Sequence, residues 1–277
     1  EGAGAGTAID GHGTTDTLFN IEQIRASMNG DTLTGNSGNN AFEGRGGADT
    51  IDGGAGFDTL RYDQSLAAVT VTFSNVVAGQ GTAADGGFSG VAQATDSFSN
   101  IEAVRGSDFN DTLTGGIGDQ TLEGMAGNDV ISGGDGNDTV NYGSSLYQTS
   151  IGVTVTLAAG AATVTDSWGG TDSLSGIENI QGSQFNDTLT GDANNNSFLG
   201  RSGNDTIDGG TGSDTAQFSG SKVGYQVTKG AGFYTVTDTN LADGNDGTDT
   251  LFGIEKLVFS DGTVNLGSKL LQNDYNG

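Results

Sequence analysis

A nine-residue period is the feature that most restricts the fold of this chain. It occurs in three runs of four turns each, at residues 30–61, 110–141 and 186–217. Counted from the leading Gly of each turn, position six is usually Asp and position eight is almost always apolar. A six-residue Gly-rich turn permits positive φ angles, and the next three residues suit a short strand. The period therefore predicts an all-β solenoid of regularly stacked coils.

The apolar residue at position eight is the middle residue of each short strand, so its side chain faces one side of that strand. Stacked coils would gather these side chains into a thin core. The residues at this position are Leu33, Phe42, Ile51, Leu60, Leu113, Leu122, Ile131, Val140, Leu189, Phe198, Ile207 and Ala216.

The acids at position six would form columns, because equivalent turns of stacked coils lie about 4.8 Å apart. Two turns make one coil, so each turn stacks on the second turn onward. The predicted acid–acid pairs are Asp31 with Asp49, Asp111 with Asp129, and Asp187 with Asp205; the amide–acid pairs are Asn40 with Asp58, Gln120 with Asp138, and Asn196 with Asp214. Like charges at this spacing repel each other, and Ca²⁺ is a hard cation that oxygen ligands bind. We expect calcium to bind more tightly on the acid–acid side.

Composition supports a need for cations and excludes several classes of protein. The 277 residues include 35 acidic and 9 basic side chains, a net charge of −26, 51 Gly, no Pro and no Cys. The charge excludes nucleic acid as a partner. The lack of Cys excludes disulfides and cysteine-bound metals, and no apolar run is long enough for a transmembrane segment. With hydrophobic residues at only 33%, the chain should fold poorly without bound cations.

A longer period organises the whole chain. The segment Thr15–Glu22 recurs at residues 95–102, 171–178 and 248–255, at steps of 80, 76 and 77 residues. This is a repeat array, and because nothing before Ile9 matches the strand segment that precedes the other copies, we expect it to continue a longer one. The predicted organisation is a partial spacer at 1–29, β-roll blocks at 30–61, 110–141 and 186–217, strand-rich spacers at 62–109 and 142–185, and a spacer with a C-terminal cap at 218–277.

The spacers contain strand patterns of their own. Residues 69–73, 153–157 and 233–237 alternate between apolar and polar side chains or are rich in β-formers. Leu174, Ile177 and Ile180 lie three residues apart, which predicts a short helical turn or bend that leads into a strand. We expect the spacers to continue the solenoid as wider coils, and residues 256–266 to form a strand that caps it.

The turns "GGAGFDTLR", "GGDGNDTVN" and "GGTGSDTAQ" resemble the GGxGxDxUx nonapeptide of the RTX (repeats-in-toxin) family. The resemblance implies a parallel β-roll that binds Ca²⁺ between stacked turns through Asp carboxylates and backbone carbonyls. The departures lie mostly in the second turns, where Asn40, Gln120 and Asn196 replace Asp, so full occupancy is not expected there. The metal-binding residues that the resemblance implies are Asp31, Asp49, Asp58, Asp111, Asp129, Asp138, Asp187, Asp205 and Asp214, the leading glycines Gly35, Gly44, Gly53, Gly115, Gly124, Gly133, Gly191, Gly200 and Gly209, and Asn40 and Asn196.

Other polar residues point less clearly to function. The acids Asp16, Asp96, Asp172 and Asp249 recur once per long period, and a turn-capping role is favoured over metal binding for them. His12 is the only histidine, and the sequence has no GxSxG or HExxH motif. Paired carboxylates can cleave glycosides, but here the acids lie on regular turns where metal binding accounts for them. We expect no enzymatic activity.

Resemblance to the RTX family implies type I secretion of an unfolded chain that folds in millimolar calcium outside the cell. Extracellular calcium sites with dissociation constants of about 10⁻⁴ to 10⁻³ M would permit such a switch. We therefore expect a secreted, extracellular structural module, part of a surface-layer or adhesin-type protein at the cell surface and open to self-association into an array or filament. The alternative is a C-terminal carrier domain of a secreted protease, lipase or epimerase; the full open reading frame would distinguish the two.

Overall fold

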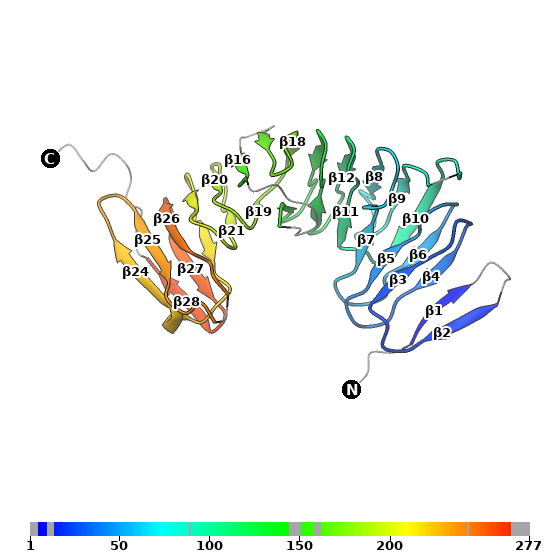
Figure 1. The fold of residues 1–277 in the computed structure, drawn as a ribbon, viewed down its shortest axis with the longest axis horizontal. Helices are drawn as coiled ribbons and strands as arrows, with labels where there is room; N and C mark the ends of the chain where they lie inside the picture. Colours follow the sequence, from blue (N-terminus) through cyan, green and yellow to red (C-terminus); the bar gives the residue numbers. More distant parts are fainter. Residues whose placement is uncertain are drawn as a thin grey trace. The chain divides into compact units, whose positions relative to one another are not determined.

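A computed structural model describes residues 5–9, 14–88, 90–143, 151–157, 162–242 and 244–266. These residues form strands joined by turns and bends, and the one helical segment among them is a 3₁₀ turn at Lys222–Gly224. The chain divides into two compact units, residues 1–138 and 139–277 (Figure 1). Within the described residues, no helix is long and apolar enough to cross a membrane.

Each nonapeptide contributes one three-residue strand, and successive strands alternate between two sheets, which we call wall A and wall B. In the first block, β4 (Thr32–Thr34) and β6 (Thr50–Asp52) pair in parallel in wall A. The intervening β5 (Ala41–Glu43) pairs in parallel with β7 (Thr59–Arg61) in wall B. One coil is therefore 18 residues, and the predicted all-β, parallel β-roll is confirmed.

Both walls can be followed strand by strand in unit 1. Wall A runs in the order β2 (Thr15–Leu18), β1 (Gly6–Ile9), β4, β6, β10 (Thr95–Ser99), β9 (Gly81–Ala84), β8 (Thr70–Phe73), β12 (Thr112–Thr114) and β14 (Val130–Ser132). Wall B runs in the order β3 (Gln23–Arg25), β5, β7, β11 (Ala103–Arg105) and β13 (Thr121–Glu123).

Unit 2 has the same two-walled plan. Wall A runs β18 (Thr171–Ser175), β17 (Ala162–Thr165), β16 (Thr154–Thr156), β20 (Thr188–Thr190), β22 (Thr206–Asp208), β26 (Thr248–Phe252), β25 (Tyr234–Asp238) and β24 (Tyr225–Lys229). Wall B runs β15 (Thr139–Asn141), β19 (Asn179–Gln181), β21 (Ser197–Leu199), β23 (Thr215–Gln217), β27 (Lys256–Phe259) and β28 (Gly262–Asn265).

The spacers do not form wider coils, and that expectation was wrong. In unit 1 the spacer adds an antiparallel meander of β8, β9 and β10 to wall A but only β11 to wall B. The order of the strands is reversed in the process, so that β10 pairs with β6 and β8 pairs with β12. Short loops between β8, β9 and β10 turn the chain back on itself, and such a connection makes antiparallel rather than parallel neighbours.

A residue with left-handed backbone, rather than a helical turn, connects the two walls after the last wall A strand of each spacer. Asn100 has φ 53°, and Gly176 and Gly253 at the equivalent places have φ 58°. This corner keeps apolar residues three positions apart on the inside of both walls: Leu174, Ile177 and Ile180 are all at most 6% exposed. The sequence predicted either a short helical turn or a bend here, and the structure has the bend.

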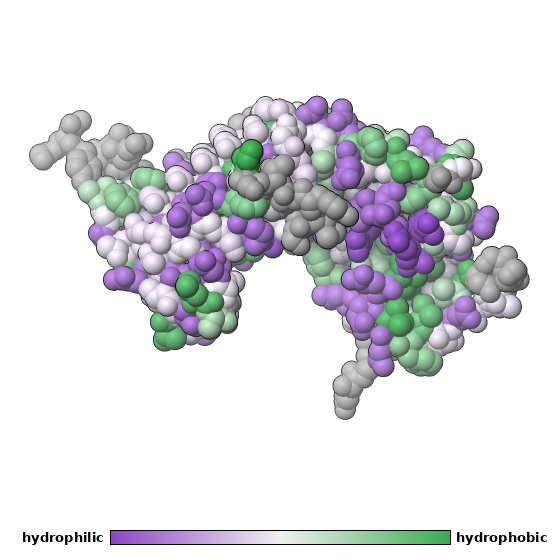
Figure 2. Space-filling model, in the orientation of Figure 1, coloured by the Kyte–Doolittle hydropathy of each residue, from purple (hydrophilic) through white to green (hydrophobic). Residues whose placement is uncertain are grey.

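The core is a thin layer between the walls. Every apolar residue predicted at position eight is at most 2% exposed. In the spacer, the rings of Phe73 and Phe98 meet edge to face with centroids 5.0 Å apart. Gly81 makes this contact possible, since a Cβ there would lie 2.4 Å from Phe98 Cζ. Hydrophobic residues also reach the surface, among them Val76 and Val223, and Figure 2 shows them scattered among hydrophilic ones.

Candidate metal centre

The residues at position six form two columns along the corners of the roll. Column A precedes the strands of wall A and contains Asp31, Asp49 and Asp96, then Asp111 and Asp129, then Asp187, Asp205 and Asp249. Column B precedes the strands of wall B and contains Asn40, Asp58 and Glu102, then Gln120 and Asp138, then Asn196, Asp214 and Glu255. All the Asp, Asn and Gln members are at most 7% exposed.

One hydrogen bond repeats along the columns. The backbone N–H of a position-six residue donates to the side-chain oxygen of the column residue one coil onward: Asp31 to Asp49 Oδ1 at 2.7 Å, and Asp187 to Asp205 Oδ1 at 2.8 Å. In column B the N–H of Asn40 donates to Asp58 Oδ1 at 2.7 Å. All six predicted stacking pairs are joined in this way.

The recurring acids of the long period extend these columns. Asp96 Oδ1 accepts the N–H of Asp49 at 2.9 Å, and Asp249 Oδ1 accepts the N–H of Asp205 at 2.9 Å. The turn-capping role favoured for these two acids was therefore wrong: their partners are 47 and 44 residues away. Glu102 and Glu255 do the same in column B, through Oε2 at 2.8 Å. Sequence reasoning missed both glutamates, although their strict recurrence was a signal.

The first acid of each block differs from the later ones because a serine donates hydrogen bonds to its carboxylate. Ser27, Ser107 and Ser183 lie four residues before Asp31, Asp111 and Asp187, respectively. Each serine donates its N–H to the Oδ2 of its acid and a hydroxyl hydrogen bond to the same carboxylate. The first acid therefore already has protein donors on its carboxylate, and it closes the end of its block.

For the acids that follow, the folded structure disfavours the ionised form. Burial, with the neighbouring carboxylates of Asp96, Asp31 and Asp85, raises the pKa of Asp49 to about 8. Burial and neighbouring carboxylates likewise raise the pKa of Asp205 and of Asp249 to about 8, and burial raises the pKa of Asp58 to about 6. Desolvation and like charges disfavour the ionised form. A cation held between the carboxylates would remove that penalty.

The residues present fit such a cation. The Oδ2 atoms of Asp49, Asp58 and Asp205 are buried without a hydrogen-bond partner. Space beside each is kept open by the leading glycine of its turn: a Cβ on Gly44 would lie 2.2 Å from Asp49 Oδ2, and one on Gly200 would lie 2.1 Å from Asp205 Oδ2.

Backbone carbonyls line the same corners. The carbonyl oxygen of Gly53 is 2.1 Å from the position that a Cβ on Gly35 would take, and that of Gly133 is 1.7 Å from the equivalent position on Gly115. Within the described residues, no group of three or more acidic or histidine side chains could hold a metal by itself. A cation here would therefore combine carboxylate with carbonyl oxygens, the ligands that Ca²⁺ takes in sets of six to eight.

Comparison with protein families identifies the repeat. The family model described as the RTX calcium-binding nonapeptide repeat (4 copies) matches residues 27–60, 99–119, 114–144, 172–206 and 181–216. These matches fall on the three nonapeptide runs, which are therefore RTX calcium-binding repeats. A search of curated proteins found no match to the chain.

The predicted ligands of the RTX repeats occupy unequal places. Asp49, Asp58 and Asp205 have an oxygen available in a glycine-lined corner. The amide oxygens of Asn40 and Asn196 already accept hydrogen bonds from their own turns. Asn40 Oδ1 accepts the N–H of Asn36 at 2.8 Å, and Asn196 Oδ1 accepts the N–H of Asp192 at 2.9 Å. The second turns thus close with an internal amide cap where the other turns have a carboxylate.

The other predicted ligands lie at the places that the period requires. Asp111, Asp129, Asp138, Asp187 and Asp214 are buried members of the columns. Gly35, Gly44, Gly53, Gly115, Gly124, Gly133, Gly191, Gly200 and Gly209 each begin a turn at the end of a strand. His12 lies outside the described residues, and Asp16 is exposed on β2.

A second ladder on the turns of the RTX repeats was not anticipated. At position five, the side-chain oxygen of one turn accepts the N–H of the position-five residue one coil onward. Asn186 Oδ1 accepts the N–H of Asn204 at 2.8 Å, and Asn204 Oδ1 accepts that of Thr248 at 2.8 Å. The recurrence of Asn or Asp at position five was the available signal. These bonds satisfy turn backbone groups and hold adjacent coils in register.

Proposed function

We propose that the chain is an extracellular structural module that folds when calcium enters its columns. The observation that carries this proposal is the stack of buried carboxylates, in which burial and neighbouring acids raise the pKa of Asp49 and its Oδ2 has no hydrogen-bond partner. Without a cation the folded state must bring these like charges together in a region of low polarity. The unfolded chain avoids that cost by leaving them in water.

Calcium changes the balance because it binds the folded state and not the unfolded one. Ligand sites built from stacked turns do not exist in the unfolded chain, so binding energy becomes folding energy. In the submicromolar calcium of a cell interior the chain would stay unfolded, and millimolar calcium outside would fold it. This behaviour suits export of an unfolded chain followed by folding at its destination.

We further propose that the module serves as a spacer or lattice element in a surface-layer or adhesin-type protein, and that it has no catalytic role. The repeat array and the use of the buried acids in regular columns support this role. A catalytic domain in the full open reading frame would instead indicate the carrier domain of a secreted enzyme, whereas further periods of about 77 residues would support the scaffold.

Folding should be measured against calcium by far-ultraviolet circular dichroism and small-angle X-ray scattering. In chelator we expect a spectrum without strand signal and a radius of gyration near that of an unfolded chain of this length, about 60 Å. Millimolar Ca²⁺ should restore strand signal and compaction in one cooperative step. Mg²⁺ at the same concentration is the control, since it requires a smaller octahedral site. Equal strand signal in chelator and in calcium would refute the proposal.

A further inference from the structure

A single row on the outer face of wall A in unit 2 has a threonine on every described strand. Each of these threonines is the register partner of the next. From β18 to β24 the row consists of Thr171, Thr165, Thr154, Thr188, Thr206, Thr250, Thr235 and Thr228. Six of these residues are exposed, and Thr250 and Thr235 are half-buried. We call this set the threonine row.

The nonapeptide repeat does not account for the threonine row. Only Thr188 and Thr206 stand at position seven of a nonapeptide, and the other six lie on spacer strands outside the nonapeptide runs. The matching row of wall B in the same unit is interrupted, since it reads Thr139, Asn179, Ser197, Thr215 and Lys256. The strand preference of threonine applies to both walls, so it does not explain an unbroken row on one of them.

A second rank of hydroxyl groups runs beside the threonine row over four strands. It consists of Ser173, Thr163, Thr156 and Thr190 on β18, β17, β16 and β20, with Thr163 opposite Ser173 and Thr156 opposite Thr190. Beyond β20 this rank changes to Asp208 and Phe252. The two-rank array is therefore confined to the strands from β18 to β20.

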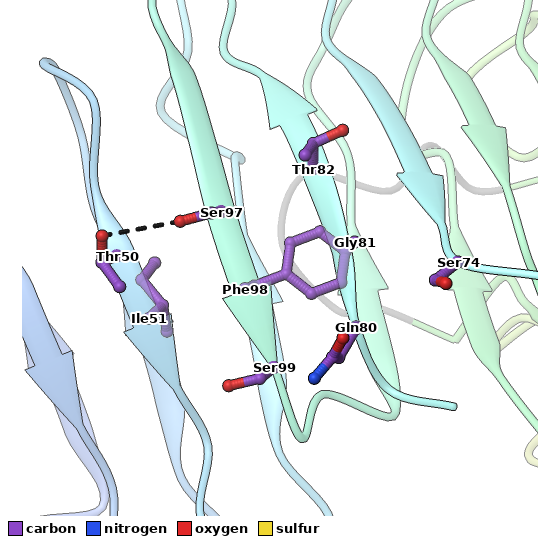
Figure 3. Close-up of a pocket in the computed structure, with 9 residues that line it drawn as sticks. All are labelled: Thr50, Ile51, Ser74, Gln80, Gly81, Thr82, Ser97, Phe98 and Ser99. Atoms are coloured by element: carbon purple, nitrogen blue, oxygen red, sulfur yellow. Dashed lines mark hydrogen bonds between the residues drawn. The ribbon is translucent and has the colours of Figure 1, made fainter. Parts of the chain in front are cut away.

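Unit 1 repeats the pattern on its own wall A. Seven consecutive strands place Thr32, Thr50, Ser97, Thr82, Thr72, Thr114 and Ser132 in one register row. An open groove of about 420 Å³ lies along this row and is lined by Thr50, Ser97 and Thr82 among others (Figure 3). Both units thus present a hydroxyl row on wall A, partly from spacer strands that recur with the long period.

The chemistry of these rows suits an uncharged, regularly spaced partner. The rows contain no charged side chain, although the chain carries a net charge of −26. Each threonine offers one hydroxyl donor and two acceptor positions beside a methyl group, repeated every 4.7–4.9 Å or about one strand spacing. That repeat is close to the distance between equivalent oxygens within the layers of ice. Charged side chains would instead bind water in shells of their own.

We propose that the threonine row and its second rank bind ice. Water molecules hydrogen-bonded to successive hydroxyl groups would take up positions that a growing ice lattice can share. A saccharide is less suited to this surface, because the two ranks from β18 to β20 contain no aromatic ring on which a sugar could stack.

The calcium-loaded chain should be tested by slow growth of an ice hemisphere in its solution, with the fraction of protein taken into the ice as the readout. We expect incorporation of the parent chain. T154K and T188K place a charged side chain at neighbouring points of the row, and each should reduce incorporation to the level of a protein that ice excludes. T215K on wall B is the matched control and should be incorporated like the parent.

Circular dichroism in calcium reports whether each variant folds, so a failure of ice binding is separate from a failure of the calcium proposal. If the lysine variants do not fold, T188V keeps the shape of the side chain and removes its hydroxyl, and it should lower incorporation. Exclusion of the folded parent chain from ice would overturn the proposal. So would equal loss in T215K, or row-dependent retention on insoluble cellulose or chitin without any incorporation into ice.

Discussion

Replacement of Asp205 by Asn separates the two effects of a column acid. The carboxylate is 2% exposed, its Oδ1 accepts the N–H of Asp187, and its pKa is raised from 3.8 to about 8. An amide oxygen can still accept that N–H, but the charge is gone. We therefore expect D205N to stabilise the metal-free fold and to weaken calcium binding, which are opposite changes caused by one substitution.

The size of the first effect follows from proton linkage. At pH 7 the unfolded carboxyl is ionised and the folded one is mostly protonated. The difference of about three pH units between 3.8 and 7, at about 1.4 kcal/mol each, corresponds to a destabilisation of about 4 kcal/mol in the parent chain. D205N removes this contribution and keeps a hydrogen bond that is worth about 1 kcal/mol.

The assay is a calcium titration followed by circular dichroism at pH 7, begun in chelator. D205N should show more strand signal than the parent in chelator and should need more calcium to complete its transition. N196D is the reverse substitution on column B, where the amide stacks on Asp214, and should shift both quantities the other way. A D205N variant that shows no more strand signal than the parent in chelator and has an unchanged calcium midpoint would contradict the electrostatic reasoning.

Three further outcomes follow from the same geometry. The folded pKa values of Asp49, Asp205 and Asp249 are raised to about 8, so their contribution to stability is fully present below about pH 4 and is lost as the pH rises to about 8. A pH series in chelator should therefore show strand signal falling between these pH values. A strand signal that rises would be inconsistent. G200A should raise the calcium midpoint, because the new Cβ would lie 2.1 Å from Asp205 Oδ2. G232A is the control for a glycine substitution outside the columns: its Cβ would meet nothing within 4 Å, and it should leave the calcium midpoint unchanged. F198A should lower the free energy of unfolding in calcium by about 3–5 kcal/mol in a denaturant titration, because this fully buried ring fills the thin core; a loss below 1 kcal/mol would show that the core does not limit stability.

Much of the roll could be predicted because its information is local. A nine-residue period sets both the turn and the strand, and two turns make a coil, so the stacking partner of Asp31 could be named as Asp49 without a structure. The same arithmetic placed Leu33 and Ile51 in the core. Errors arose where the period stops. The spacers were expected to coil, but their loops reverse the chain into an antiparallel meander.

The roles of Asp96 and Glu102 show why the spacers were harder. Both acids stack on residues more than 40 positions earlier in the chain, and that register depends on how much chain the meander takes up. Spacing in the sequence does not determine it. The hydrogen bonds from a serine to the first acid of each block were also not predicted. They depend on the shape of the turn, since Ser27 reaches the Asp31 carboxylate only once the turn between them is closed.

By itself the amino-acid sequence predicted a β-roll of short parallel strands, its apolar interior and the pairs of position-six residues that stack on each other, because each of these depends on contacts that repeat every nine or eighteen residues. Only the tertiary structure decided which carboxylate oxygens are left without a partner, how the long-period acids join the columns, and that threonines from spacer and nonapeptide strands line up on one wall. Those features depend on the register between distant strands, and that register is set when the spacer meanders pair.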